Sequence, residues 1–473
     1  MNDSVSRTRY LAKNTLIFSL GNIGSKLVAF FLVPLYTNAL VTGQYGTADL
    51  ITNIVIVAAP VIFLNIGEAV MRFALDKNAD VNRIMSVAYL IMLFSLLPAS
   101  LLAFGIVLYK RLSEYLVLIL LYVFAMGISQ IFFCCLRGRE MLMKYSVGNI
   151  IQALLIAVFN ILFLVVFEWG IKGYLLAYIL SYAVTAVYAF IAGKAYEVFK
   201  YFHIDRELLK QMLIYSVVLI PNNFMWWIMN SSDRLMVIEM VSAEVAGIYA
   251  VSYKLPSIVA VMTGVFNQAY SYSAIKENES KDSAEFNGSV FEAFFSFLML
   301  IGMVILIVLK PFMSFYVESK YYEAWMFSPP LIVGMTVMAL GTFLSNYYVV
   351  NKDSKGFMLS ATTGAAVNVG LNFLLIPHFG AMGAAVATCV SYMAVFTYRF
   401  FDIRKYIKLR VFTVKNVISF VLLIVAALLV YPEALWCICA KIVSLVLLVV
   451  IKFASIRSVF AKLSEGLLKR RAK

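Results

Sequence analysis

The chain alternates long apolar runs with short polar, mostly basic, segments along its whole length. A helix that crosses a hydrocarbon core of about 30 Å needs about 20 mostly apolar residues. By this measure the sequence predicts about fourteen membrane-spanning helices and an all-α integral membrane protein. The first six are expected at 14–36, 50–70, 84–109, 115–135, 145–167 and 170–193, the next six at 211–238, 247–272, 290–309, 326–350, 356–377 and 380–400, and the last pair at 416–431 and 435–453.

The basic residues predict how these helices are oriented, because cytoplasmic loops of membrane proteins carry an excess of Lys and Arg. With the N-terminus in the cytoplasm, most of the 39 basic residues fall in cytoplasmic segments. One miscounted helix in the middle would invert every later loop and destroy this asymmetry. The sequence therefore predicts both termini, including the basic tail 462–473, on the cytoplasmic side. The external loops are expected to hold Lys110, Arg111, Lys172, Lys310 and Lys320.

Composition excludes most other classes of protein. Hydrophobic residues make up 63% of the chain and charged residues 14%, against about 45–50% and about 25% in soluble domains. The net charge of +14 is explained by the loops and does not indicate a nucleic-acid partner. The five cysteines lie in apolar segments and the two histidines stand apart, so we expect no metal site. Without a phosphate-binding Gly-Lys-Ser/Thr loop or a nucleophile–histidine set, we expect neither an enzyme nor a bound cofactor.

Segments in the two halves of the chain resemble each other. Residues 145–160 align with 357–372, and residues 170–173 align with 380–383 after a two-residue shift. Equivalent segments lie six helices apart, an even number, so both copies run in the same direction, as in transporters with parallel repeats. Two such lobes imply a cavity between them and transport by alternating access. The predicted parts are an N-terminal lobe at 1–202, a C-terminal lobe at 203–400, and a helix pair with a basic tail at 401–473.

Cations inside the predicted spans are candidate binding residues, because ionisable groups at bilayer depth are expensive and usually face a cavity or a partner. Lys26 is expected near the middle of the first span. Arg234 and Lys254 lie toward the external side of the seventh and eighth spans, where they are expected to form one cationic wall. The alternatives are a buried structural pair for Lys26 and extension of the other two to the outer interface. Lys441, in the last span, could reach the external headgroups.

Two carboxylates accompany these cations. Glu68 and Arg72 are four residues apart on one helix face and are expected to be able to pair. Asp233 precedes Arg234 and is expected to orient one of the cations; Glu68 and Asp233 are also candidates for proton coupling. Arg137 and Arg139, at the end of the fourth span, are interpreted as residues that fix its orientation in the membrane. Several Asn and Gln side chains within the predicted spans are expected either to line a cavity or to hold helices together. They are Asn222, Asn223, Asn230, Asn267, Gln268 and Asn368.

Five segments carry a resemblance to a known family. Residues 26–37 read KLVAFFLVPLYT, 43–46 read GQYG and 67–73 read GEAVMRF. Residues 233–235 read DRL, and 246–255 read AGIYAVSYKL. These segments resemble the first span and loop, the end of the second span, and the seventh–eighth hairpin of polysaccharide flippases. The chain is therefore identified as similar to the Wzx-like branch of the multidrug/oligosaccharidyl-lipid/polysaccharide (MOP) exporter superfamily.

The resemblance implies a V-shaped, two-lobed transporter in a bacterial cytoplasmic membrane. It would move undecaprenyl-(pyro)phosphate-linked oligosaccharide to the external leaflet for O-antigen, capsule or exopolysaccharide synthesis, driven by protons, sodium or the membrane potential. By analogy, Lys26, Arg72, Arg234 and Lys254 would contact the pyrophosphate or acidic sugars. The implied partners are membrane lipid, the lipid-linked oligosaccharide and a glycan polymerase. The alternatives are a multidrug or other small-molecule antiporter of the same superfamily and, because two spans exceed the common twelve, a flippase for lipid II or a teichoic-type precursor.

Overall fold

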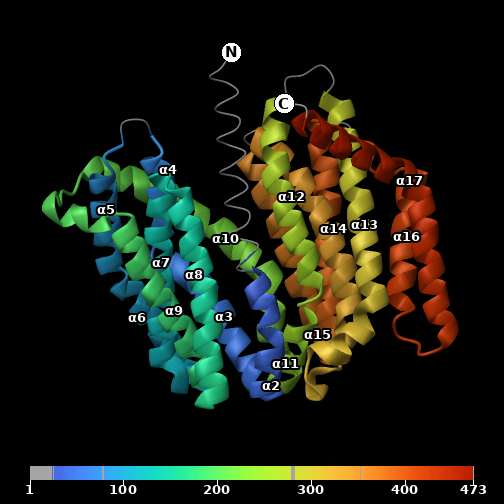
Figure 1. The fold of residues 1–473 in the computed structure, drawn as a ribbon. Coiled ribbons are helices and arrows are strands. Elements are labelled where there is room, and N and C mark those ends of the chain that lie inside the picture. The colour runs from blue at the N-terminus through green and yellow to red at the C-terminus, as the bar shows by residue number, and fades with distance from the viewer. Residues whose placement is uncertain are drawn as a thin grey trace. The chain divides into compact units, whose positions relative to one another are not determined.

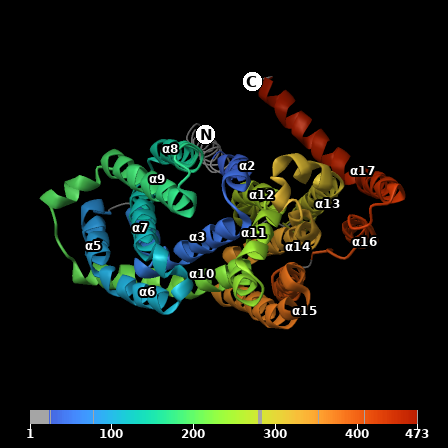
Figure 2. The ribbon, with the colours of Figure 1, turned by 90° about the horizontal axis from the view of Figure 1, so that it is seen from below.

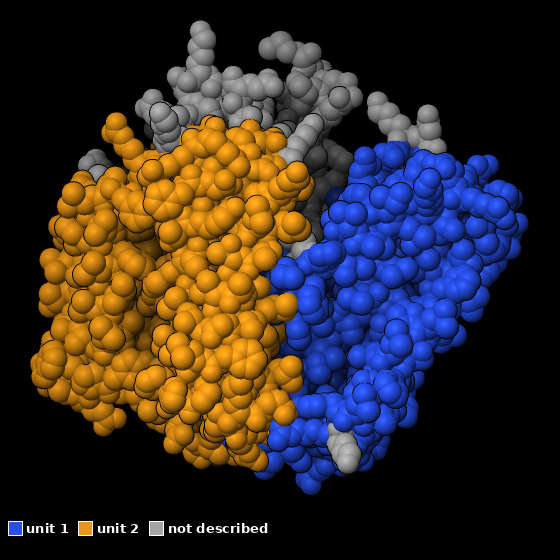
Figure 3. Space-filling view, turned by 180° about the vertical axis from the view of Figure 1, so that it is seen from behind, with its two compact units in different colours: residues 1–227 blue, residues 228–473 orange. Residues whose placement is uncertain are grey.

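The computed structural model describes residues 24, 26–76, 79–277, 283–351, 353–407 and 409–471, with side chains outside 110, 222, 268–269, 271–277, 283–286 and 454–471. Within these residues every regular element is a helix, so the predicted all-α class is confirmed (Figure 1). The chain divides into two compact units, Met1–Trp227 and Ile228–Lys473, which Figure 3 shows in different colours. The boundary expected at 202/203 lies just before the long helix that contains this division.

Unit 1 is built around α7. This helix packs against α9, α4 and α3, and Figures 1 and 2 show it among the other helices of the unit. The elements are α2 (Val33–Ala39), α3 (Thr42–Ile62), α4 (Ile66–Ala74), α5 (Val81–Phe94), α6 (Leu96–Leu108), η1 (Lys110–Tyr115), α7 (Leu116–Gly138), α8 (Leu142–Asn160), η2 (Ile161–Val166), α9 (Gly170–Ala192), η3 (Ala195–Lys200) and the first part of α10 (Arg206–Met240).

Unit 2 is built around α14, the most buried of its candidate spans. This helix packs against α15, α12, α13 and α11, while α16 and α17 lie against α13. The elements that follow α10 are α11 (Ala243–Ser252), α12 (Pro256–Glu277), α13 (Ser283–Tyr316), η4 (Ser319–Tyr321), α14 (Ala324–Val350), α15 (Ser354–Asp402), η5 (Ile403–Lys405), α16 (Val414–Leu428) and α17 (Leu435–Arg471).

Ten helices among the described residues are long and apolar enough to cross a membrane, or eleven if the pair α11–α12, bent by 46°, forms one span. The 49 residues of α15 are interrupted at Gly380, and the two predicted spans at 356–377 and 380–400 are its two arms. The shorter apolar helices Lys26–Ala39 and Val414–Leu428 coincide with part of the predicted first span and with the thirteenth. A total of fourteen spans stays a prediction.

The two aligned hairpins share their backbone geometry. Gly170 and Gly380, which the alignment makes equivalent, both have φ of +56°, a conformation that L side chains avoid. Three residues later, a Cβ on Gly173 would lie 3.0 Å from the carbonyl oxygen of Phe163, and one on Gly383 would lie 2.4 Å from that of Leu375. Each hairpin therefore turns on one glycine and closes on a second, which supports an internal duplication.

Candidate functional site

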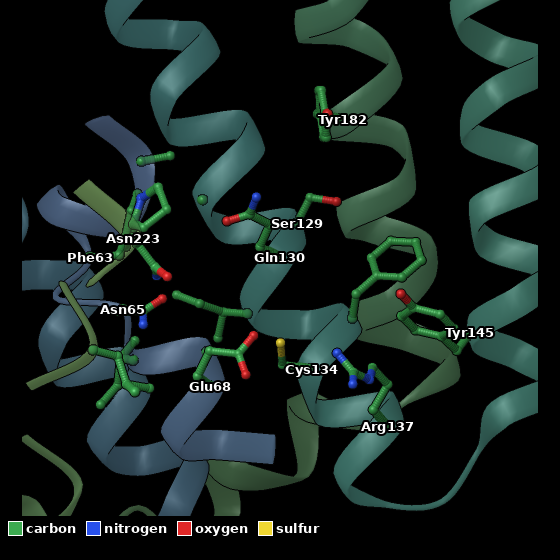
Figure 4. Close-up of a pocket in the computed structure, with 18 of the residues that line it drawn as sticks. Phe63, Asn65, Glu68, Ser129, Gln130, Cys134, Arg137, Tyr145, Tyr182 and Asn223 are labelled. Atoms are coloured by element: carbon green, nitrogen blue, oxygen red, sulfur yellow. The ribbon is translucent and has the colours of Figure 1, made fainter. Parts of the chain in front are cut away.

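Unit 1 contains a cavity of about 650 Å³ between α3, α4, α7, α8, α9 and the first part of α10 (Figure 4). Aromatic and aliphatic side chains such as Phe63, Phe133 and Leu219 form part of its wall. Its size lies within the usual range of small-molecule sites, about 300–1,000 Å³. The polar residues of the wall are Asn65, Glu68, Ser129, Gln130, Arg137, Tyr145, Asn149, Gln152, Tyr182, Tyr215 and Asn223.

A break between α3 and α4 shapes one wall of the cavity. Pro60 lies in the last turn of α3, and Leu64 and Asn65 then take left-handed φ angles of 50° and 52°, which are unusual for residues other than glycine. The backbone N–H of Asn65 donates to the backbone carbonyl oxygen of Pro60 at 2.6 Å and closes this turn. The Asn65 side chain is buried, and its Nδ2 has no hydrogen-bond partner among the described residues. The break thus places a buried amide without a hydrogen-bond partner among the described residues at the wall of the cavity.

One carboxylate and one guanidinium group face this cavity. Glu68 lies in the first turn of α4 and Arg137 in the last turn of α7. Figure 4 shows the Cys134 sulfur between them, and the guanidinium carbon of Arg137 lies 5.7 Å from the centroid of the Tyr145 ring. A guanidinium group binds phosphate or carboxylate through two parallel hydrogen bonds. Sequence reasoning took Arg137 for an anchor of topology, because a basic residue at the end of a span has that role in most membrane proteins.

The structure separates Glu68 from Arg72. The Arg72 guanidinium donates to Asp76 at 2.8 Å, in an ion pair whose side chains are about half exposed. The expected Glu68–Arg72 pair is therefore wrong. Asp76 is also four residues from Arg72. It lies just after the end of α4, so both side chains of this ion pair stay solvated. Arg72 is not part of the cavity wall, and neither is Lys26, an exposed residue at the start of the described helix Lys26–Ala39.

Unit 2 buries the Asp233 carboxylate completely. It accepts hydrogen bonds from the hydroxyls of Tyr249 at 2.7 Å, Tyr253 at 2.5 Å and Thr388 at 3.2 Å. The Arg234 backbone N–H donates to its other oxygen at 2.9 Å. A buried charge needs such partners, and α10, α11, α15 and the turn after α11 provide them.

An amide network continues from this carboxylate. The Asn368 side chain donates to Thr388 and accepts from Ser232 and Asn372. The Oδ1 of Asn372 is buried without a hydrogen-bond partner among the described residues. Asn368 thus holds helices together, one of the two roles expected for it. The four residues Asp233, Asn368, Asn372 and Thr388 are called the Asp233 cluster below.

The two predicted cations of this region are both near Tyr253, Arg234 in space and Lys254 in the sequence. The guanidinium carbon of Arg234 lies 4.8 Å from the centroid of the Tyr253 ring. Lys254 follows Tyr253 in the turn between α11 and α12 and is partly buried. Their action as one cationic wall stays a prediction.

Sequence reasoning missed two buried cations, because each lies at the end of a span that the predicted topology places on the cytoplasmic side. Arg399 donates from Nε to the Ser360 hydroxyl at 3.0 Å and from Nη1 to the Gly341 carbonyl at 2.9 Å. Lys452 forms an ion pair with Glu292 at 2.6 Å and a hydrogen bond to Asn416, which joins α17, α13 and α16. Within the described residues no group of three His, Cys, Asp or Glu side chains is arranged to hold a metal ion.

The fold defines the class of protein. The chain is similar to a solved structure of the lipid II flippase MurJ in an inward closed conformation, with a TM-score of 0.67 and 12% identity over 94% of this chain and 100% of that one. It is also similar to an inward-facing multidrug resistance MATE transporter of the MOP superfamily (TM-score 0.57, 14% identity, 82% and 94% covered) and to a MOP superfamily transporter from Pyrococcus furiosus (0.56, 14%, 83% and 94%). This is a multi-pass membrane protein with the MOP transporter fold.

The sequence gives the family more narrowly. The sequence model of the polysaccharide biosynthesis protein family matches residues 11–275, and the chain belongs to this family. An uncharacterized membrane protein of Methanocaldococcus jannaschii is 22% identical over 430 residues, which cover 82% of this chain and 96% of that protein. The resemblance found in the sequence is thereby confirmed. The matched region includes the whole cavity of unit 1 and, of the Asp233 cluster, Asp233 itself.

Proposed function

We propose that this protein flips an undecaprenyl-(pyro)phosphate-linked oligosaccharide from the cytoplasmic to the external leaflet of a bacterial cytoplasmic membrane by alternating access. Its product would feed a glycan polymerase or assembly protein at the external face. One observation carries the proposal: a chain of the polysaccharide biosynthesis family holds a cavity whose wall is rich in hydroxyl and amide groups and includes one guanidinium group.

The chemistry of the cavity favours a glycan phosphate over a lipophilic cation. Hydroxyl and amide groups match the hydrogen-bonding groups of sugars, and Arg137 matches a phosphate or an acidic sugar. A carrier of lipophilic cations would be expected to present uncompensated carboxylates, whereas Glu68 shares the wall with Arg137. The likeness to MurJ favours a second candidate, a flippase for lipid II or a teichoic-type precursor, which needs the same phosphate chemistry.

Export of lipid-linked glycan in cells tests the proposal. We expect Arg137→Gln to lower export about tenfold or more, because a hydrogen bond to a charged group contributes about 1.5–3 kcal/mol and 1.4 kcal/mol is about a factor of ten. Arg137→Lys should restore part of it, and precursor should accumulate on the inner leaflet. Arg72→Gln, at equal protein abundance, is the matched control, since Arg72 is exposed and paired with Asp76.

The same assay decides among the other residues and functions. Loss of export in Lys26→Ala, Arg234→Ala or Lys254→Ala would add those cations to the substrate path. Normal export in Arg137→Gln would remove the cavity of unit 1 from that path. Normal export after deletion of the whole protein would overturn the flippase proposal and make drug transport the next assay.

We further propose that a small cation bound at the Asp233 cluster drives transport. Hard cations prefer oxygen ligands, and the cluster offers one carboxylate with the hydroxyl of Thr388 and the amide oxygens of Asn368 and Asn372. One negative charge suits a monovalent ion. We favour sodium over a proton, because the ionised carboxylate accepts four hydrogen bonds and protonation would displace a donor. The amide oxygen of Asn372 without a hydrogen-bond partner supports a further ligand.

Thermal unfolding of the purified protein tests this coupling. Sodium should raise the melting temperature of wild type, relative to equal concentrations of potassium or choline, and should not raise that of Asp233→Asn. Glu68→Gln is the comparison for the other candidate carboxylate. If sodium leaves the melting temperature of wild type unchanged, and the melting temperature changes with pH in wild type but not in Asp233→Asn, the coupling ion would be the proton. No response to either would leave the membrane potential as the driving force.

A further inference from the structure

Lys441 differs from every other buried charge in the described part of the chain. The four buried charged side chains there are those of Asp233, Arg399, Lys441 and Lys452. Asp233 accepts hydrogen bonds from hydroxyl groups, Arg399 donates to a carbonyl and a hydroxyl group, and Lys452 forms an ion pair with Glu292. Lys441 is only 7% exposed, yet it has no hydrogen bond or ion pair to any residue that the structure describes.

The position of Lys441 places its ammonium group near one end of unit 2. It lies six residues after Leu435, where α17 begins, or about 9 Å along the helix. This end is external in the predicted topology. The side chain is covered although α17 has exposed apolar residues beside it, including Ile438 and Ile442. Its burial therefore reflects contact with the protein and not simple extension into lipid.

A second cation, Lys310 near the end of α13, lies at the same end of unit 2, because α13 packs against α17 and Lys310 pairs with Glu433, two residues before α17 begins. The Lys310 Nζ lies 4.0 Å from the centroid of the Trp325 ring and 3.7 Å from Glu433. Glu433 is 88% exposed and Lys310 21% exposed, so this ion pair is weak and solvent can replace it. Two ammonium groups, one of them without a partner, thus share a site with one loosely held carboxylate.

The tryptophan and tyrosine residues at this end of unit 2 are typical of a membrane interface. The Trp325 ring lies 6.0 Å from that of Tyr431, whose hydroxyl donates to the Met326 carbonyl oxygen at 3.0 Å. Trp436, in the first turn of α17, is 63% exposed. Such rings gather at the depth of the lipid headgroups, where phosphate groups are abundant.

We propose that Lys441 and Lys310 form a binding site for the phosphate of a lipid headgroup in the outer leaflet, between α17 and α13. The phosphate supplies the negative charge that the protein lacks at Lys441, and its oxygens accept from both ammonium groups. The protein covers most of the Lys441 side chain, while its Nζ keeps accessible surface and has no partner among the described residues, so a phosphate oxygen can reach it. Transport by the cavity of unit 1 is not needed for this site to bind lipid.

Native mass spectrometry of the full-length protein, released from detergent into three lipids, tests the site. The probes are phosphatidylglycerol, a polyprenyl monophosphate, and a diacylglycerol glycolipid without phosphate. We expect wild type to retain a phosphate lipid, and Lys441→Met and Lys310→Met to bind it about tenfold more weakly or worse, while Lys441→Arg retains it. Lys172→Met is the matched control, since Lys172 is an exposed cation at the predicted external end of unit 1 and is paired with Glu114 at 2.8 Å.

Thermal unfolding distinguishes a lipid site from a lysine that only extends to the interface. Without a phosphate lipid, Lys441→Met should melt at or above the temperature of wild type, because it removes an unpaired cation. Phosphatidylglycerol should raise the melting temperature of wild type and leave that of Lys441→Met unchanged. Selective retention of the polyprenyl phosphate would support a site for the carrier lipid, and equal retention of both phosphate lipids would support one for phospholipid. Equal binding by wild type and Lys441→Met, or binding of the glycolipid alone, would overturn the proposal and leave the transport proposal untouched.

Discussion

Asp353 shows how one carboxylate can fasten a loop at the scale of single residues. It caps the start of α15 by accepting from the Gly356 N–H at 2.9 Å, and it also accepts from Lys405 at 2.9 Å and from the Tyr406 hydroxyl at 2.8 Å. These donors, the Gly356 N–H first, lower the pKa of Asp353 to about 2. The carboxylate thus joins the start of α15 to the segment after its end.

The lowered pKa of Asp353 predicts that the stability of the protein falls in acid. A carboxyl group whose pKa falls on folding stabilises the protein above its ordinary value of 3.8, and the stabilisation is lost as the pH falls from there toward about 2. We therefore expect the difference in melting temperature between wild type and Asp353→Asn to be constant near neutral pH and to vanish in that acid range.

Melting of the purified protein from neutral pH to about pH 2 measures this difference. Asn still caps the helix, so the variant isolates the charge. Lys405→Met should move the loss to higher pH, because it removes one of the groups that lower the pKa of Asp353. A difference that stays constant down to the lowest pH would contradict the assignment.

Single charges were the least predictable features of the sequence. Spacing alone allowed Glu68 to pair with Arg72, but Arg72 has a second carboxylate, Asp76, at the same spacing. Arg137, at the end of α7, has the same sequence context as an exposed anchor, and only the packing of α4 and α8 beside it makes it part of a cavity wall. Asp233 was singled out correctly as an expensive charge, but its partners come from residues up to 155 positions away.

At the scale of elements, the duplicated hairpins allow a graded test of packing. Gly383 has no room for a methyl group, since a Cβ would lie 2.4 Å from the carbonyl oxygen of Leu375. Gly380 has room but a φ of +56°, and Gly370 has room and no unusual φ. These three glycines, all within α15, separate steric overlap from backbone strain.

We expect Gly383→Ala to destabilise the protein most, by about 1–3 kcal/mol or more, because the backbone must shift. Gly380→Ala should cost about 1–3 kcal/mol, because its φ of 56° with ψ of −139° is a combination that is open essentially only to glycine. Gly370→Ala is the matched control and should be neutral or stabilising by up to about 1 kcal/mol. Reversible unfolding in mixed micelles gives the three values, and a Gly383→Ala variant as stable as Gly370→Ala would contradict the close contact.

Helices were more predictable than their interruptions. Apolar length located most of the described helices, because the bilayer sets that length, but the span predicted at 50–70 runs across the break between α3 and α4. The break between α3 and α4 follows Pro60, but the left-handed angles of Leu64 and Asn65 depend on tertiary packing and leave no signal in the sequence. The glycine pairs at 170/173 and 380/383 did leave a signal, since their geometry excludes other side chains.

At the scale of the whole molecule, the repeat, the loop charges and the proposed lipid site all depend on the direction in which each helix crosses the membrane. Hairpins six helices apart must run in the same direction if the predicted spans are complete. The part of the chain that the structure describes has ten long apolar helices, or eleven with the bent pair, and the break at Gly380 separates one of them into two arms. The short α16 decides whether Lys441 and the loop before α17 face outward.

Cysteine labelling of intact cells checks this topology. In a Cys439→Ser background, which removes the exposed native thiol, a membrane-impermeant maleimide should label Lys320→Cys and Glu433→Cys from outside. Lys355→Cys should react only after the cells are permeabilised, because the positive-inside rule places its loop in the cytoplasm. Labelling of Lys320→Cys without Glu433→Cys would mean that α16 does not span the membrane. That result would also contradict the ion pair between Glu433 and Lys310, which lies at the same end of α13 as Lys320, and with it the proposed lipid site.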